Sequence, residues 1–120
     1  MLNFINHPCF EKESSQFSNR FPKFNDGLDS FKKICEVHFH PTNPKQVLSP
    51  GKLHRVKAFD SYVLWKIELA VKNLRSNQSP RMWFAIQGTT IALLCIGTHV
   101  DNYDDGERSK IAESLATDIF

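Results

Sequence analysis

The chain has 120 residues, of which 41% are hydrophobic and ten are phenylalanine, so one domain can bury a core without disulfides or metals. The formal net charge of +2 excludes the strongly basic class in which charge alone predicts a nucleic-acid ligand. No apolar run reaches the roughly 18 residues of a membrane span, and the N-terminus lacks the features of a secretory signal. We expect a single cytoplasmic domain, residues 1–120, with no membrane partner.

The first part of the chain predicts a short strand and a helix. Residues 1–5 are apolar enough for an edge strand. Pro8 suits the first turn of a helix, where its missing N–H is not needed. Phenylalanines then recur close to one helical stripe until Pro22, which ends or redirects the helix.

A second helical pattern follows over residues 28–38, with Asn25 or Asp26 as the expected N-cap. The two helices predict a helical hairpin whose apolar stripe needs a partner surface. Residues 40–51 contain three prolines and other turn formers, so we expect a loop there.

The second half of the chain has the alternating pattern of β-strands. We expect strands at residues 53–59, 62–71, 81–87 and 90–96, and a tight hairpin at Gly88 between the last two. One face of this sheet is apolar and is the expected partner of the helical hairpin. The last residues again show helical spacing after Asp104 or Asp105, which predicts a C-terminal helix.

The other face of the sheet gathers charge. Alternation places Lys66, Glu68 and Arg81 on this second face. His99 and Tyr103 follow the last strand. This grouping is the main functional clue in the sequence.

Arg55 and Lys57 are expected to share a face and to converge with Lys66 and Arg81 on a surface suited to a phosphate backbone. The alternative is an ordinary solvated face of a half-buried sheet. Trp83 alternates onto the same face, where it either stacks a base or packs beneath a neighbouring segment.

The second face has groups that suit cleavage of RNA by its own 2′-OH. That reaction needs a proton acceptor at the hydroxyl, positive charge at the phosphate and a proton donor at the 5′-oxygen. Glu68 or His99 can accept, Arg81 or Lys66 can stabilise charge, and His99 can donate.

Metal and redox chemistry have little support in the sequence. The string DNYDDG is better interpreted as a helix-capping turn than as a calcium loop. His38 and His40 have no further ligands at zinc-site spacing. Cys35 and Cys95 lie in apolar surroundings and are expected to be buried free thiols. We expect no metal and no cofactor.

Three strings resemble the RelE/ParE toxin superfamily of bacterial toxin–antitoxin systems. HPCFEKESSQFSNRFPKFNDGLDSFKKI resembles the family's opening helical hairpin, KLHRVKAFDSYVLWKIELAV its first β-hairpin, and SPRMWFAIQGTTIALLCIGTHVDNYDD its closing β-hairpin. The resemblance implies an α+β fold. A helical hairpin would pack on a twisted, mainly antiparallel sheet of four or five strands whose other face is open and basic.

The same resemblance implies a toxin that cuts mRNA without a metal, on or off the ribosome, and a partner antitoxin that masks it. The catalytic positions it implies are Lys66, Glu68, Arg81, His99 and Tyr103. The RNA-binding positions it implies are Lys52, Arg55 and Lys57, and the alternation of the strand adds Trp83 as a candidate RNA-binding residue. The chain departs from the family in its low net charge, in the spacing of His99 and Tyr103, and in the helix that follows them.

Two alternatives remain open. A second branch of the superfamily inhibits DNA gyrase and lacks the acid–base residues, and a non-catalytic interaction module could share the fold. His99, Glu68 and Arg81 together favour the nuclease.

Overall fold

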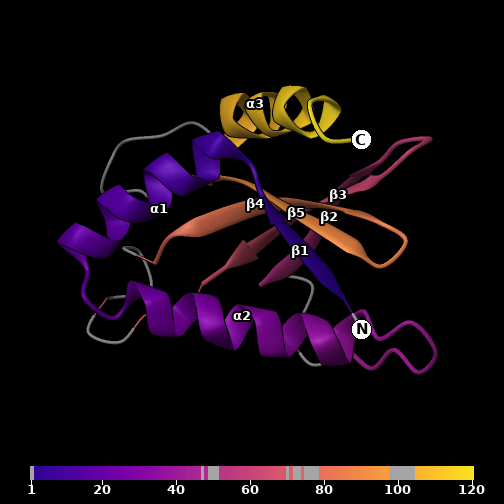
Figure 1. The fold of residues 1–120 in the computed structure, drawn as a ribbon, viewed down its shortest axis with the longest axis horizontal. Helices are drawn as coiled ribbons and strands as arrows, with labels where there is room; N and C mark the ends of the chain where they lie inside the picture. Colours follow the sequence, from indigo (N-terminus) through magenta and orange to yellow (C-terminus); the bar gives the residue numbers. More distant parts are fainter. Residues whose placement is uncertain are drawn as a thin grey trace.

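The computed structural model describes residues 2–46, 48, 52–69, 71, 74, 79–97 and 105–120. These residues form an α+β fold with three helices and a five-stranded mixed sheet. In chain order the elements are β1 (Asn3–Asn6), α1 (Pro8–Arg20), α2 (Phe24–His38), β2 (Leu53–Ala58), β3 (Val63–Glu68), β4 (Arg81–Gln87), β5 (Thr90–Gly97) and α3 (Asp105–Thr117). Figure 1 shows α2 and α3 on opposite sides of the sheet.

The strands lie in the order β1-β5-β4-β3-β2. The chain from β2 to β5 forms an antiparallel meander, whereas β1 joins the edge of the sheet parallel to β5. The β4–β5 turn contains Gly88 at φ +59°, a backbone conformation that glycine adopts at no steric cost. The expected edge strand, the four later strands and the glycine hairpin are therefore confirmed.

The first helix begins where the sequence predicts it, with Pro8 in its first turn and the Nδ1 atom of His7 accepting a hydrogen bond from the Cys9 N–H at 3.0 Å. The second helix begins earlier than expected. Lys23 is at its N-cap position and makes no side-chain capping bond, so the predicted cap at Asn25 or Asp26 is wrong. Phe24 is fully buried in the first turn, so burial of an aromatic ring fixes this start in place of a cap.

The helical hairpin covers one face of the sheet and forms the larger core. Phe31 of α2 meets Phe84 of β4 edge-to-face, with ring centroids 5.0 Å apart, a favourable geometry for aromatic pairs. The side chains buried in this core include Phe10, Phe17, Phe24, Phe31, Cys35, Ile67, Met82, Phe84, Ile91, Leu93 and Ile96. The predicted partnership between the hairpin and the apolar sheet face is confirmed.

The third helix covers much of the opposite face and forms a second core. Alanines lie on both sides of this contact, which lets the helix approach the strands closely. The buried residues are Tyr62, Leu64, Trp83, Ala85, Ala92, Leu94, Cys95, Ala112 and Ala116. The open second face implied by the family resemblance is thus wrong over β4 and β5, because α3 lies there (Figure 1).

Two polar contacts join α3 to the start of the chain. Asp118 Oδ2 lies 2.8 Å from His7 Nε2, and Arg108 NH1 lies 2.9 Å from Glu13 Oε2. They hold the two ends of α3 against the region around α1. Of the helices formed by the described residues, none combines the length and the apolar character that crossing a membrane requires.

Candidate functional site

Glu68 and Arg81 occupy directly opposite positions on β3 and β4. Paired residues on antiparallel strands point to the same face, so the two side chains meet, with Arg81 NH2 3.9 Å from Glu68 Oε2. Both are about one-fifth exposed, at 21% and 23%. The NH1 atom of Arg81 is buried and has no hydrogen-bond partner among the described residues. The pair therefore combines a partly exposed carboxylate with guanidinium donors that are not saturated.

A second row of side chains lies one step along the same face. Lys66 pairs with Trp83 on β4 and with His54 on β2. The Lys66 Nζ atom lies 5.9 Å from the centroid of the Trp83 ring. The structure therefore groups Lys66 with Glu68 and Arg81, as the alternation pattern predicts.

His54 is a candidate that the sequence pattern did not single out. Its side chain is exposed and shares the face of Lys66 and Glu68. The signal is present in the sequence, because His54 precedes Arg55 in an alternating strand and therefore points to the face opposite Arg55. The sequence pattern assigns Arg55 and Lys57 to the charged face, and this assignment implies that His54 points to the opposite, apolar face.

The strand β2 contains a bulge between Arg55 and Lys57. Arg55 pairs with Trp65, whereas Lys57 pairs with Leu64. Since neighbouring residues of β3 point to opposite faces, the two basic side chains are on opposite sides of the sheet, and the prediction that they share a face is wrong. Arg55 belongs to the α2 side. Lys57 is on the Glu68 side but about 13 Å further along the strand.

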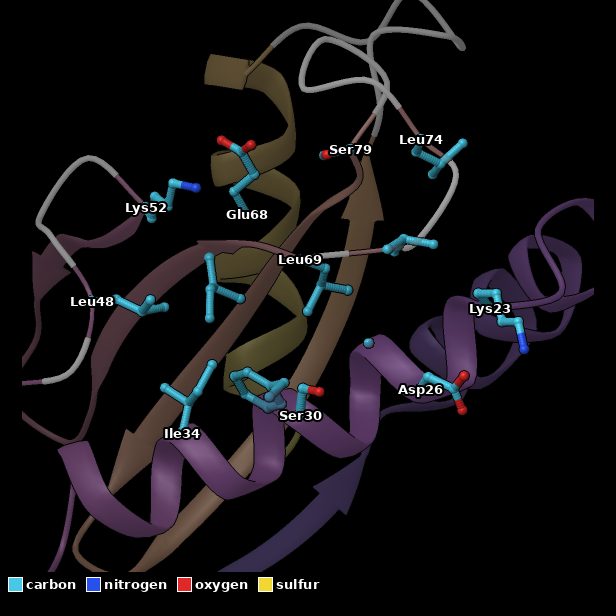
Figure 2. Close-up of a pocket in the computed structure, with 14 residues that line it drawn as sticks. Lys23, Asp26, Ser30, Ile34, Leu48, Lys52, Glu68, Leu69, Leu74 and Ser79 are labelled. Carbon is cyan, nitrogen blue, oxygen red and sulfur yellow. The ribbon is translucent and has the colours of Figure 1, made fainter.

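Lys52 lies beside Glu68, whose backbone N–H donates a hydrogen bond to the Lys52 carbonyl at 2.9 Å. Both residues border a hollow of about 560 Å³ between α2 and the end of β3. Figure 2 shows their side chains on one side of the hollow, and Asp26 and Lys23 of α2 on the other. Apolar side chains such as Leu69 line its interior.

Trp83 does not have the exposed ring that base stacking requires. Its exposed fraction is 0%, and its indole N–H donates to Ser109 Oγ of α3 at 3.1 Å. Of the two alternatives that the sequence leaves open, packing beneath a neighbouring segment is the one observed. His99 and Tyr103 lie outside the described residues.

The assembled groups provide the elements of acid–base chemistry at a phosphate. The Glu68 carboxylate can accept a proton, and Arg81 and Lys66 present positive charge from the same side. His54 adds an imidazole, a group that can act as a proton acceptor or donor. A guanidinium binds phosphate oxygens through parallel N–H bonds. No group of three or more potential metal ligands occurs among the residues that the structure describes.

Comparison of the chain with protein-family models, with curated proteins and with solved structures gave no match.

Proposed function

We propose that the protein is the toxin of a type II toxin–antitoxin system and acts as an mRNA endoribonuclease that inhibits translation. One observation supports this most strongly: Glu68 and Arg81 face each other in the sheet, and the Arg81 NH1 atom is buried without a partner among the described residues. A buried donor that lacks an acceptor is costly, and a phosphate oxygen is a fitting acceptor. The resemblance to the RelE/ParE superfamily supports the same conclusion.

In the proposed reaction Glu68 takes the proton from a ribose 2′-OH. The 2′-oxygen attacks the adjacent phosphorus, and the bond to the 5′-oxygen of the next nucleotide breaks. The products are a 2′,3′-cyclic phosphate and a 5′-OH, whose oxygen receives a proton from His54 or His99. Arg81 and Lys66 stabilise the extra negative charge of the pentavalent transition state, and Lys52 contributes a further positive charge beside Glu68.

The proposal includes a cognate antitoxin protein that covers this surface. Such a partner needs only to block access to Glu68 and Arg81, because both are partly exposed at the end of their strands. A helix or strand laid across the β3 and β4 ends would do so.

The test is induced expression of the wild type and of Arg81→Ala in bacteria, with growth and total mRNA measured in the same cultures. We expect growth arrest and mRNA fragmentation in the wild type and neither in Arg81→Ala. Arg55→Ala is the matched control, because it removes the same charge from the opposite sheet face, and we expect it to retain mRNA cleavage.

The other outcomes identify the alternatives. Growth arrest with intact mRNA would favour a gyrase inhibitor. A well-expressed wild type that causes no arrest would favour a non-catalytic interaction module.

A further inference from the structure

The end of α2 and the neighbouring strands form a surface that combines apolar side chains with positive charge. Val37, in the last turn of α2, is 42% exposed. Trp65 of β3 and Phe39, which follows α2, are both half-buried at the margin of the larger core. We call the surface formed by Val37, Phe39, Lys45, Arg55 and Trp65 the α2-end surface.

The Trp65 ring is fixed by two other rings from the end of α2. Its centroid lies 5.0 Å from that of Phe39 and 6.0 Å from that of His38, both in edge-to-face geometry. A large side chain that is already held in place loses little conformational entropy when a ligand covers it. Tryptophan is also one of the residues that contribute most to binding energy in protein interfaces. Trp65 is therefore suited to anchor a protein ligand.

Two exposed cations flank the apolar side chains. Arg55 lies directly opposite Trp65 on β2, so it belongs to the same face of the sheet. Lys45 lies beside Val37, because its backbone N–H donates a hydrogen bond to the Val37 carbonyl at 3.1 Å. Neither side chain forms an ion pair with another residue that the structure describes. Both cations are therefore available to an anionic ligand.

The strand that carries Arg55 offers no acidic side chain to repel such a ligand. Strand β2 has the sequence LHRVKA. It is also at the edge of the sheet, with no strand on its outer side among the described residues. A carboxylate that approaches Arg55 therefore meets positive charge and no like charge from this strand.

The combination of charge and apolar surface selects among possible occupants. A second copy of the chain, bound symmetrically through this surface, would bring Lys45 and Arg55 against the same cations of its partner, and like charges in an interface are unfavourable. The phosphates of RNA would attract the cations but would not cover the exposed Val37 side chain. An acidic polypeptide with an apolar residue matches both parts of the surface.

We propose that the α2-end surface binds an acidic segment of a partner protein. An apolar residue of that segment covers Val37 and Trp65, and its carboxylates lie beside Lys45 and Arg55. This interaction goes beyond the proposed nuclease activity and does not depend on it. Arg55 is on the sheet face opposite Glu68, so a segment bound at the α2-end surface leaves the proposed catalytic pair accessible.

The test uses a short fluorescein-labelled synthetic peptide in which leucines are flanked by glutamates and aspartates. Fluorescence anisotropy compares its binding to the wild type, to Arg55→Gln and to the control Lys12→Gln. Lys12 is exposed on α1, which packs on β5 at the far side of the sheet from β2. We expect Arg55→Gln to raise the Kd about fivefold, as loss of one charge pair should, and Lys12→Gln to change it less than about twofold.

The apolar part of the surface is tested separately. Val37→Ser removes an exposed apolar side chain, and we expect it to raise the Kd about fivefold. A peptide in which lysines replace the acidic residues should not bind. Urea unfolding of every variant confirms that the fold is retained.

Tryptophan fluorescence locates the bound peptide. Trp83 is fully buried, so quenching of the native protein by acrylamide reports mainly on half-buried Trp65. We expect the acidic peptide to reduce this quenching in the wild type. Unchanged quenching at saturating peptide would place the peptide elsewhere and overturn the proposal.

The other occupants give different results. If the acidic peptide does not bind at about 1 mM, the weak end of the affinity scale, while Arg55→Gln weakens binding of a 2′-O-methyl oligoribonucleotide, the surface binds nucleic acid and the proposal is overturned. A wild-type dimer that Val37→Ser dissociates, measured by sedimentation, would assign the surface to a second copy of the chain. Equal peptide binding by Arg55→Gln and Lys12→Gln would also overturn the proposal.

Failure of this interaction and failure of the proposed function are distinguishable. Peptide binding that depends on Arg55 and Val37 in a protein that cuts no RNA would retain the interaction and reject the nuclease. RNA cleavage that depends on Arg81, in a protein that does not bind the peptide, would retain the nuclease and reject the interaction. If the peptide blocked cleavage, it would cover the Glu68 face instead, and the assignment to the α2-end surface would be overturned.

Discussion

Arg81 NH2 and Glu68 Oε2 lie 3.9 Å apart across the β3–β4 ladder, which is too far for a hydrogen bond. The two charges attract each other, but at this distance the guanidinium does not donate a hydrogen bond to the carboxylate. A tight bidentate pair would occupy the carboxylate and the guanidinium together. The looser pair leaves both available to a ligand that enters between them.

We predict that Glu68→Gln lowers the rate of RNA cleavage at least about 100-fold, because an amide cannot accept the 2′-OH proton. The loss of stability should stay below about 1 kcal/mol, as for other partly exposed ion pairs. Single-turnover cleavage and urea unfolding measure the two effects. Glu11→Gln on the exposed side of α1 is the control and should cut normally. A Glu68→Gln protein that cuts at the wild-type rate would remove Glu68 from the mechanism.

We predict that His54→Gln slows cleavage by about 10-fold or more, because it removes a proton donor or acceptor from the row beside Glu68. The control is His40→Gln, because His40 lies in the segment after α2, where its Nδ1 accepts hydrogen bonds from the backbone of Thr42 and Asn43. The pH profile of cleavage should change only in the His54 variant. Equal rates and profiles for both variants would show that His54 has no part in proton transfer.

The packing of α3 leads to a prediction about stability. Trp83→Ala should reduce the free energy of unfolding by about 3–5 kcal/mol, because it removes a large, fully buried ring from beneath the helix. Ser109→Ala removes one acceptor of the indole N–H and should cost about 1 kcal/mol. Urea unfolding followed by circular dichroism measures both changes. A small loss for Trp83→Ala would mean that α3 is not docked on this face in solution.

We predict that His38 makes the folded protein less stable in acid. Burial lowers the pKa of its imidazole below the usual 6.5, and its Nδ1 atom is buried without a partner among the described residues. The unfolded chain therefore binds a proton more readily than the native protein does, so stability falls as the pH drops below about 6.5. The His38→Gln variant lacks this contribution.

The measurement is the free energy of unfolding of the wild type and of His38→Gln from pH 8 to pH 5. We expect the wild type to lose more stability than the variant on acidification. Parallel curves for the two proteins would contradict the prediction, and comparing the two subtracts the contributions of the other histidines.

The thiols should differ in reactivity. Burial raises the pKa of Cys95 to about 12 and also raises that of Cys35, so both remain protonated at pH 8 and are shielded from solvent. Cys9 is only half-buried, although burial and the neighbouring Glu13 raise its pKa as well. Alkylation of the native protein with iodoacetamide should therefore label Cys9 first, and mass spectrometry identifies the site. Early labelling of Cys35 would contradict its place in the core.

The sequence is sufficient to predict most of the elements and the charged face. Period-two alternation is a local property, so the residue pattern alone correctly places Lys66, Glu68 and Arg81 together. The turn at Gly88 is equally local. These features depend on residues within one strand or one hairpin.

The features that could not be predicted depend on contacts between distant segments. The bulge that separates Arg55 from Lys57 adds one residue to a strand without any glycine or proline to mark it. The burial of Trp83 depends on where α3 docks, and the helix pattern alone does not give that face. The early start of α2 at Phe24 is likewise decided by a core that forms between segments far apart in the chain.

The parallel pairing of β1 with β5 has a consequence for the order of folding. Asn3 is synthesised long before its partner Thr90. Strand β1 cannot pair until β5 has been made, and pairing between residues so far apart in the sequence forms slowly. Until then the nascent chain has an incomplete sheet edge. Glu13 likewise meets both Ile96 and Arg108 only after β5 and the start of α3 have been made. A newly made chain therefore completes this edge of the sheet only after both β5 and α3 have been made.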